Sequence, residues 1–209
     1  MRWFATLLAV SVLPAAAGAE DPAVTLARRV DARHRRAGDL TAKFVQTYRS
    51  ATLGRELVER GTLAIKRPGR MLWEYRDPER KTFLSDGKTY YFYVPADKQV
   101  IVRDQAGERG LPTLLLSGQG DILSQFAVGL EADPAAGHKR LRLVPRKPDP
   151  EVERVYLEVD AQDRIVGIEV YDAQDNYSLF RFDDVRENVG LGEQLFQFRT
   201  PKGVEIVAG

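Results

Sequence analysis

Apolar and polar residues alternate along most of the chain, which is the pattern of β-strands that bury one face. The first exception is a segment from Pro22 to Ala37, whose apolar residues have helical spacing. Asp21 precedes this segment as a candidate N-cap and proline suits the first helical position, so we expect an amphipathic helix that ends at Gly38. From Leu40 the period changes to two, which predicts a strand. One face of that strand carries Ala42, Phe44, Gln46 and Tyr48.

The two-residue period returns in a series of later segments. They are residues 57–65, 71–75, 82–84, 89–94, 99–102, 140–144, 152–160, 165–171, 177–182 and 195–198. Asp86-Gly87 lies between two of them and favours a tight hairpin, because glycine tolerates the positive φ that such turns need. We therefore expect these strands to form an antiparallel meander.

The alternation stops between Gly110 and Glu131, where leucine runs, two glycines and Asp121 precede another apolar series. We interpret this segment as two short helices, the second capped by Asp121. The predicted fold is mainly β (α+β), with a single curved antiparallel sheet. Its concave apolar face needs a cover, which the N-terminal helix and the two short helices can supply only in part. A partial cover leaves room for a cavity.

Residues 1–19 have the features of a secretory signal peptide. Arg2 precedes an apolar run that is too short to cross a bilayer, and Ala17-x-Ala19 fits cleavage before Glu20. A first core helix is the alternative, but no polar face interrupts the run. We therefore expect an exported protein whose single domain spans residues 20–209.

The charge of the chain is nearly balanced, with 31 Lys and Arg against 30 Asp and Glu. Such a chain is a poor candidate for nucleic-acid binding. A local basic run, RRVDARHRR at residues 28–36, is either a solvated helix face or a surface for a partner. There is no cysteine, so neither a disulfide framework nor a lipid anchored on an N-terminal cysteine is available.

Few residues suited to catalysis are present. The only histidines are His34 and His138, and we expect both at the surface because one lies in the basic run and the other follows a turn. Gly118-Gln119-Gly120 lacks the third glycine of a dinucleotide site, and no nucleophile-elbow, zinc-protease or phosphate-loop motif occurs. Acidic clusters such as 172–175 lie where strands should end, where turns use such residues. We predict no enzyme activity, no metal site and no cofactor.

A series of motifs along the chain resembles one known family. The motifs are Phe44-x-Gln46, Gly61-x-Leu63-x-Ile65-Lys66-Arg67-Pro68-Gly69-Arg70, Trp73-Glu74-Tyr75-x-x-Pro78, Leu84-Ser85-Asp86-Gly87-Lys88, Pro112-Thr113-Leu114-Leu115-Leu116-Ser117-Gly118 and Pro201-Lys202-Gly203-Val204. Each motif alone is unspecific, but their order over nearly the whole of residues 20–209 resembles LolA, the family of periplasmic carriers of outer-membrane lipoproteins.

The resemblance implies an incomplete β-barrel whose concave face is closed by a helical lid over a cavity for lipoprotein acyl chains. It also implies partners: acylated outer-membrane lipoproteins, an inner-membrane ATP-driven ABC complex of the LolCDE type that releases them, and an outer-membrane acceptor of the LolB type. Because such an acceptor is itself a lipoprotein and this chain has no cysteine, the chain resembles the carrier, which we expect to be a periplasmic monomer.

The resemblance also indicates ligand-binding residues. Phe44, Met71, Trp73 and Tyr75 are expected to face the cavity, where a flexible thioether and broad aromatic rings adapt to chains of varied shape. The lid candidates are Leu114, Leu115, Leu116 and Leu123. The alternative for both sets is ordinary packing in the core.

Arg67 matches the arginine that in this family holds the lid by donating hydrogen bonds to its backbone carbonyls. A guanidinium group offers five fixed donors, so it can be held in an apolar setting without a carboxylate. From spacing alone, a surface arginine in a loop between strands is the alternative.

Three other functions remain open from the sequence. The first is a periplasmic sensor of lipids or lipoproteins built on the same fold, and the second is a carrier of another lipid. The third is a lipid esterase, for which no serine motif is present.

Overall fold

The computed structural model describes residues 20–52, 54–104, 111–117, 120–132 and 137–208. The strands are β1 (Asp39–Arg49), β2 (Glu56–Lys66), β3 (Arg70–Asp77), β4 (Lys81–Asp86), β5 (Thr89–Val94), β6 (Gln99–Asp104), β7 (Phe126–Glu131), β8 (Lys139–Pro145), β9 (Arg154–Val159), β10 (Ile165–Tyr171), β11 (Tyr177–Glu187) and β12 (Glu205–Ala208). The helices are α1 (Pro22–Arg36), α2 (Leu111–Ser117), α3 (Ile122–Gln125) and the 3-10 helix η2 (Glu193–Phe196).

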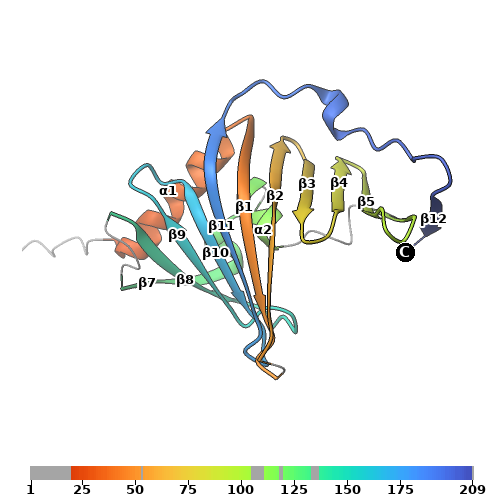
Figure 1. Cartoon of the computed structure of the whole chain (residues 1–209). Helices are drawn as coiled ribbons and strands as arrows, with labels where there is room; N and C mark the ends of the chain where they lie inside the picture. Colours follow the sequence, from red (N-terminus) through yellow and green to blue (C-terminus); the bar gives the residue numbers. More distant parts are fainter. Residues whose placement is uncertain (1–19, 53, 105–110, 118–119, 133–136, 209) are drawn as a thin grey trace, which may run out of the picture.

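Within the described residues the twelve strands form one sheet, in the order β12-β6-β5-β4-β3-β2-β1-β11-β10-β9-β8-β7. The sheet is curved and unclosed, because β7 and β12 lie at its two ends (Figure 1). This confirms the predicted incomplete barrel. The strand pairs are antiparallel except for β12 and β6, which pair in parallel.

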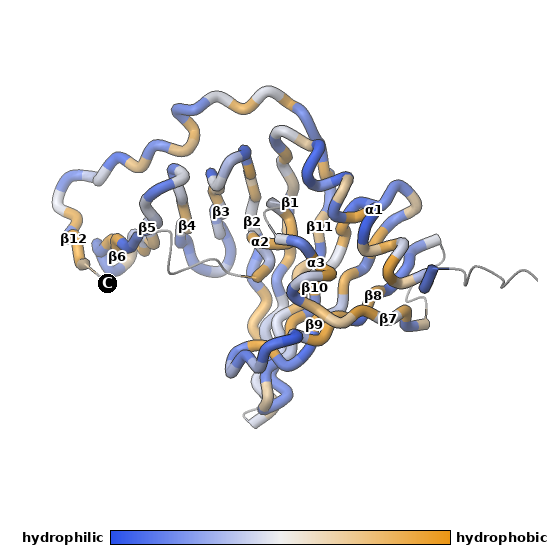
Figure 2. The backbone as a smooth tube through the Cα atoms, turned by 180° about the vertical axis from the view of Figure 1, so that it is seen from behind, coloured by the Kyte–Doolittle hydropathy of each residue, from blue (hydrophilic) through white to orange (hydrophobic). Residues whose placement is uncertain are grey.

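The two faces of the sheet carry separate apolar clusters, as the strand alternation requires. Leu63 and Ile65 of β2 point to the concave side, where α1, α2 and α3 lie (Figure 2). Ala64 points to the opposite side and packs with Phe196 of η2. The concave cluster is the larger of the two and extends across the sheet from β3 to β7. The three α-helices therefore cover one face, and the chain beyond β11, which includes η2, covers part of the other.

Local sequence signals account for α1 and for the β4–β5 hairpin. The Asp21 side chain accepts a hydrogen bond from the Ala23 amide at 2.8 Å, which confirms the predicted N-cap. In the hairpin, Gly87 has a φ of +100° and the Asp86 carboxylate accepts two backbone N–H bonds of 2.8 Å. Both elements occur where the sequence predicted them.

Two predictions around the sheet are wrong. Residues 195–198 are not a strand, because Phe196 is inserted into the convex apolar cluster and Phe198 stacks on Tyr91 at 4.9 Å. The two alternate apolar residues, Phe196 and Phe198, instead pack on the convex face and fix a segment that crosses the sheet. Residues 126–131, which we assigned to the helical segment, form the edge strand β7, and the short strand β12 was not predicted.

The basic run on α1 is largely paired with acidic residues. The ion pairs are Arg28–Glu20 at 3.1 Å, Arg29–Asp163 at 3.0 Å and Arg33–Glu187 at 2.6 Å. Two of these acids belong to the sheet and its turns, so the arginines attach α1 to the sheet. Among the described helices, none is long and apolar enough to cross a membrane.

Gly61 in β2 provides a test of this packing. A Cβ at this position would overlap the Glu74 carbonyl oxygen and lie 2.7 Å from the Phe44 ring. We expect Gly61→Ala to lower the free energy of unfolding by ~1–3 kcal/mol, because overpacking forces a backbone or ring shift. Gly129→Ala in β7 is the control, since its Cβ would meet nothing within 4 Å. Equal urea midpoints for the two variants would contradict the prediction.

Candidate functional site

The concave face carries a cluster of aromatic rings. The Phe44 ring lies 5.0 Å from that of Trp73 and 4.8 Å from that of Tyr75. Trp73 also contacts Phe180 of β11 at 5.5 Å, and all three contacts are edge-to-face, the geometry that ring quadrupoles favour. Met71 is buried on the same face, two residues before Trp73. The strand period thus brings the predicted residues of β1 and β3 together in one apolar surface.

The polar atoms within this surface have partners. The Tyr75 hydroxyl donates to Gln46 Oε1 at 2.6 Å, and Gln46 Nε2 donates to Ser178 Oγ at 2.8 Å. Burial raises the pKa of the Tyr75 hydroxyl above its ordinary value of 10.0, so the group stays neutral at physiological pH. The charges beside Tyr75 are paired with each other, since Lys81 Nζ lies 4.5 Å from the centre of its ring and 2.7 Å from the Glu59 carboxylate.

The helices α2 and α3, which we call the lid, lie on the concave side of the sheet, and α2 covers the aromatic cluster. Leu115 and Leu116 of α2 are buried in the concave core, and Leu123 of α3 is partly buried against it. The indole Nε1 of Trp73 donates to Thr113 Oγ1 of α2 at 3.2 Å. The predicted lid leucines of α2 thus lie over the predicted aromatic residues, whereas Leu123 lies on α3, beside α1 and β7.

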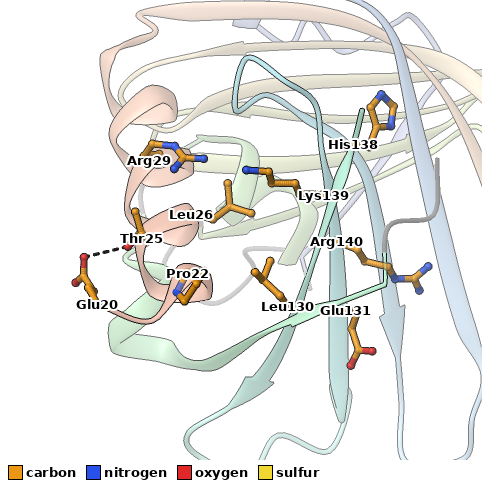
Figure 3. A pocket seen from close by; sticks show the side chains of 10 residues that line it. All are labelled: Glu20, Pro22, Thr25, Leu26, Arg29, Leu130, Glu131, His138, Lys139 and Arg140. Atoms are coloured by element: carbon orange, nitrogen blue, oxygen red, sulfur yellow. Dashed lines mark hydrogen bonds between the residues drawn. The ribbon is translucent and has the colours of Figure 1, made fainter. Parts of the chain in front are cut away.

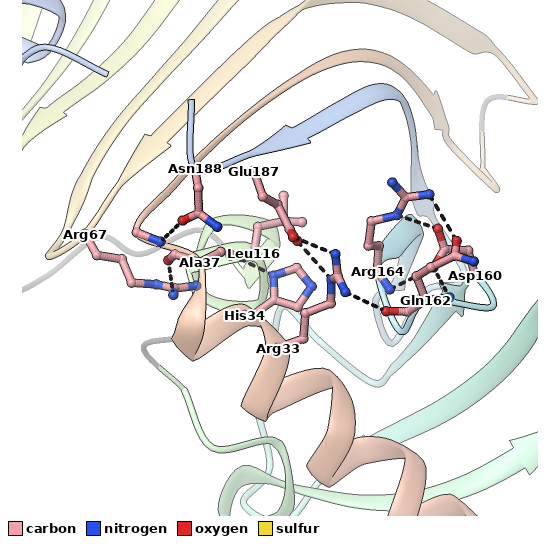
Figure 4. Close-up of polar contacts among 11 residues, drawn as sticks. Arg33, His34, Ala37, Arg67, Leu116, Asp160, Gln162, Arg164, Glu187 and Asn188 are labelled. Carbon is pink, nitrogen blue, oxygen red and sulfur yellow. Dashed lines mark hydrogen bonds and ion pairs between the residues drawn. The ribbon is translucent and has the colours of Figure 1, made fainter. Parts of the chain in front are cut away.

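Arg67, in the turn between β2 and β3, joins the lid to α1. Its Nε donates to the Ser117 carbonyl at the end of α2. Its Nη1 donates to the Ala37 carbonyl after α1 (Figure 4). Its backbone N–H donates to the Gly38 carbonyl at 3.0 Å. Arg67 is half-buried, and this desolvation lowers the pKa of its guanidinium group. The side chain therefore binds carbonyls of the lid and of α1, rather than extending into solvent as a loop arginine would.

His34 of α1 also contacts the lid, and the prediction that it lies at the surface is wrong. It is only 3% exposed, and its Nδ1 lies 3.2 Å from the Leu116 carbonyl oxygen (Figure 4). Because a carbonyl only accepts, Nδ1 carries the proton in this contact. Nε2 is buried and has no hydrogen-bond partner among the described residues. The helical period points to this burial, since His34 follows Ala27 and Val30 on the apolar stripe of α1.

Asp31 lies on the same stripe and contacts the second lid helix. It is 5% exposed, and its Oδ2 accepts from the Ile122 N–H at 2.9 Å, at the first residue of α3. The Asp121 side chain accepts from the next two amides, which confirms the predicted cap of α3. Burial raises the pKa of the Asp31 carboxyl, and the bond from Ile122 opposes this shift. The amides at the start of α3 are thus satisfied by two carboxylates, one from α1.

A cavity of about 1150 Å³ lies beside the lid. Its apolar lining comes from both lid and sheet, and it includes Tyr90, Leu111, Leu114, Phe126, Val152, Val170 and Phe180. Its polar rim contains Ser124, Gln125, Arg146, Lys147, Asp149 and Glu151. This volume exceeds the ~300–1,000 Å³ that is typical of small-molecule sites.

Of the predicted ligand-binding residues, only Leu114 lines this cavity in the closed structure. Phe44, Met71, Trp73 and Tyr75 lie next to it, in the core beneath α2. The sequence analysis missed the lining residues of β7, β10 and β11. The two-residue period of β10 and β11 was the available signal, since it places their apolar residues on the concave face.

A second pocket, of about 430 Å³, lies between the N-terminus of α1 and strands β7 and β8 (Figure 3). Leu26 and Leu130 provide apolar contacts, but charged side chains make up half of its lining. These are Glu20, Arg29, Glu131, Lys139 and Arg140. The larger cavity is therefore the better candidate for an apolar ligand.

The fold and the site define a protein that can enclose an apolar molecule between a curved sheet and a lid. The family model described as "Outer membrane lipoprotein carrier protein LolA" matches residues 35–199. The chain therefore belongs to the LolA family, as the sequence motifs predicted.

Individual relatives agree with this assignment. An outer-membrane lipoprotein carrier protein from Hahella chejuensis is 32% identical over 170 residues, which cover 80% of this chain and 80% of the relative. One from Chromohalobacter salexigens is 31% identical over 149 residues, with 70% of each chain covered. The crystal structure of an uncharacterized conserved protein from Thermus thermophilus aligns with a TM-score of 0.58 at 13% identity, covering 89% of this chain and 98% of that one. At such low identity this last similarity supports the fold alone.

The environment of His34 makes the stability of the fold depend on pH. The pKa of His34 is lowered to about 4, mainly by burial and to a smaller extent by the nearby cations Arg67 and Arg33. The Leu116 carbonyl and Glu187 act in the opposite direction. An exposed histidine has a pKa near 6.5. The unfolded chain therefore binds more protons at this residue than the folded protein does between pH ~6.5 and ~4.

We expect this difference to remove stability as the pH falls through that window. The contribution of His34 is fully present above pH ~6.5 and is lost towards pH ~4, with a size on the order of 3 kcal/mol. His34→Asn is the matched variant, because its amide keeps a donor near the position of Nδ1 but does not titrate. Urea unfolding of both proteins at pH 7, 6, 5 and 4 should show a steeper decline for the wild type. Parallel profiles would rule out this role of His34.

Proposed function

We propose that this protein is a periplasmic carrier that shields the acyl chains of lipoproteins on their way to the outer membrane. The observation that supports this most directly is the cavity of about 1150 Å³ with an apolar lining, which lies beside a lid made of two short helices. Membership of the LolA family supports the same function.

The physical need for such a carrier follows from the hydrophobic effect. At ~0.8 kcal/mol per buried methylene, one long acyl chain costs on the order of 10 kcal/mol to expose to water. A lipoprotein therefore requires a protein cavity to cross an aqueous compartment. The carrier must also release its cargo, which favours a deformable cavity under a movable lid.

In this proposal, residues 1–19 are a signal peptide cleaved near Ala19, and residues 20–209 form one monomeric carrier domain. The carrier receives lipoproteins from an ATP-driven inner-membrane complex of the LolCDE type and delivers them to an outer-membrane acceptor of the LolB type. It performs no chemistry on its cargo.

The site residues take part in two ways. When α2 moves, Phe44, Met71, Trp73 and Tyr75 become part of the cavity lining and exchange contacts with the lid for contacts with acyl chains. Leu114, Leu115, Leu116 and Leu123 are the apolar side of the lid, and Leu114 already lines the cavity. Arg67 keeps the lid closed in the empty protein through its bonds to the Ser117 and Ala37 carbonyls.

The test of this function is native mass spectrometry. The exported protein is incubated with spheroplasts that display newly made lipoproteins, with and without ATP. We expect a one-to-one complex with an intact acylated lipoprotein that forms only with ATP. Free lipid bound instead would favour a carrier of another lipid, and the absence of any adduct would favour the sensor.

Arg67 supplies the corresponding variant. We expect Arg67→Leu to fold but to cycle poorly between loaded and empty forms, because two charged hydrogen bonds hold the closed lid. Losing them should change the lid equilibrium tenfold or more. Arg60→Leu is the control, since Arg60 is an exposed arginine of β2 whose partner is Asp77 at 2.9 Å. Unchanged lipoprotein release and transfer by Arg67→Leu would refute the role of Arg67.

A further inference from the structure

Two polar residues interrupt the buried stripe of α1 and both contact the lid. Asp31 and His34 lie among Ala23, Leu26, Ala27 and Val30, where apolar side chains would pack at lower cost. Asp31 accepts from the Ile122 amide of α3 at 2.9 Å, and His34 Nδ1 lies 3.2 Å from the Leu116 carbonyl of α2. Each residue thus contacts the backbone of one lid helix.

The spacing of these residues matches the geometry of the lid. Residues three apart on a helix lie on the same face, so both side chains project towards the lid, His34 to the C-terminal end of α2 and Asp31 to the N-terminal end of α3. A donor meets the carbonyl end of α2 and a carboxylate meets the amide end of α3, which is the favourable arrangement for helix termini. One face of α1 therefore carries a hydrogen-bond donor for the C-terminal end of α2 and an acceptor for the N-terminal end of α3.

The lid helices depend on such contacts. They contain seven and four residues, and isolated helices of that length are unstable in water. Arg67 contacts the carbonyl of Ser117, which belongs to α2. Asp31 is the residue that joins α1 to the first amide of α3, and Ser124 and Gln125 of α3 lie on the cavity rim.

We propose that Asp31 and His34 form an α1 clasp, a pair of positioning residues that hold α2 and α3 closed over the cavity and release them when the lid opens. The part of this inference that concerns lipid rests on the proposed function, whereas the closure of the empty lid does not. On α2 the clasp acts together with Arg67. On α3 it acts without Arg67.

The geometry of His34 makes the clasp easy to release. One ring nitrogen is bonded to the lid, and the other is buried without a partner among the described residues. A buried acceptor without a partner carries a desolvation penalty, which water relieves once the lid moves away. His34 therefore stabilises the closed lid through the bond of Nδ1 and opposes closure through the unpaired Nε2.

Hydrogen exchange followed by mass spectrometry tests the clasp in the empty, exported protein. Loss of one hydrogen bond should raise opening roughly five- to tenfold. We expect His34→Leu to raise exchange over residues 111–117 most, and Asp31→Leu to raise it over residues 122–125 most. His34→Asn and Asp31→Asn should restore protection, because each keeps a donor or an acceptor at the contact.

Val30→Ala is the matched control. Val30 is buried on the same stripe but is apolar, so its truncation weakens the core without removing a bond to the lid. We expect a lower unfolding midpoint with no selective increase in lid exchange. Protection patterns that are alike for Val30→Ala and the leucine variants, or asparagine variants that behave like the leucine variants, would overturn the clasp.

If the leucine variants do not fold, Trp73 fluorescence in the wild type keeps the test decisive. Trp3 lies in the predicted signal peptide, so Trp73 would be the one tryptophan of an exported chain that begins at Glu20. Its indole bonds to Thr113 of α2. Lowering the pH from 7 to 4.5 should shift its emission in the wild type but not in His34→Asn. Equal shifts would overturn the part of the clasp that concerns His34.

Lipoprotein binding by the same proteins separates the two proposals. Selective lid exchange in the clasp variants, without lipoprotein binding by any form, would refute the carrier function and keep the clasp. Lipoprotein binding by the wild type, with unchanged lid exchange in the variants, would refute the clasp and keep the carrier.

Discussion

The concave face of an unclosed sheet presents aromatic and aliphatic side chains to solvent unless another element covers it, and here the cover is α1 with two short helices. The lid helices are too short to be stable on their own, so their position comes from tertiary contacts. Those contacts include leucine side chains, carbonyl groups that accept from Arg67 and His34, and an amide that donates to Asp31. Bonds of this kind are modest singly, so the position of the lid depends on the whole set.

Contacts on the convex face help to fix the link between α1 and β1, to which Arg67 is bonded. Residues 188–204 cross the convex side, and the Asp39 carboxylate accepts two of their amides at 2.7 and 2.8 Å. Asn188 Oδ1 accepts from the Gly38 amide at 2.9 Å, while the Gly38 carbonyl accepts from Arg67. The link between α1 and β1 is therefore held from both faces of the sheet.

Much of this architecture follows from local signals in the sequence. The N-cap at Asp21, the hairpin at Gly87 and the cap at Asp121 depend on neighbouring residues alone, and all three were predicted. Features that depend on residues distant in the sequence were not predicted. Phe196 belongs to a strand-like alternation but packs into the convex apolar cluster. His34 lies within a run of arginines, which favours the surface, but the helical period places it on the buried stripe of α1.

The sequence left open whether Met71, Trp73 and Tyr75 fill a core or line a cavity, and in the proposed cycle each does both. In the closed form they lie beneath α2, next to a cavity that Leu114 lines. The Tyr75 hydroxyl bonds within the sheet and keeps Gln46 as its partner when the lid moves. Of these three side chains, only Trp73 loses a hydrogen-bond partner in the lid. In the proposed cycle their exposure therefore uncovers mainly hydrocarbon, and an acyl chain that takes the place of α2 recovers most of that cost. Arg67, His34 and Asp31 give up their bonds to the lid in the same step.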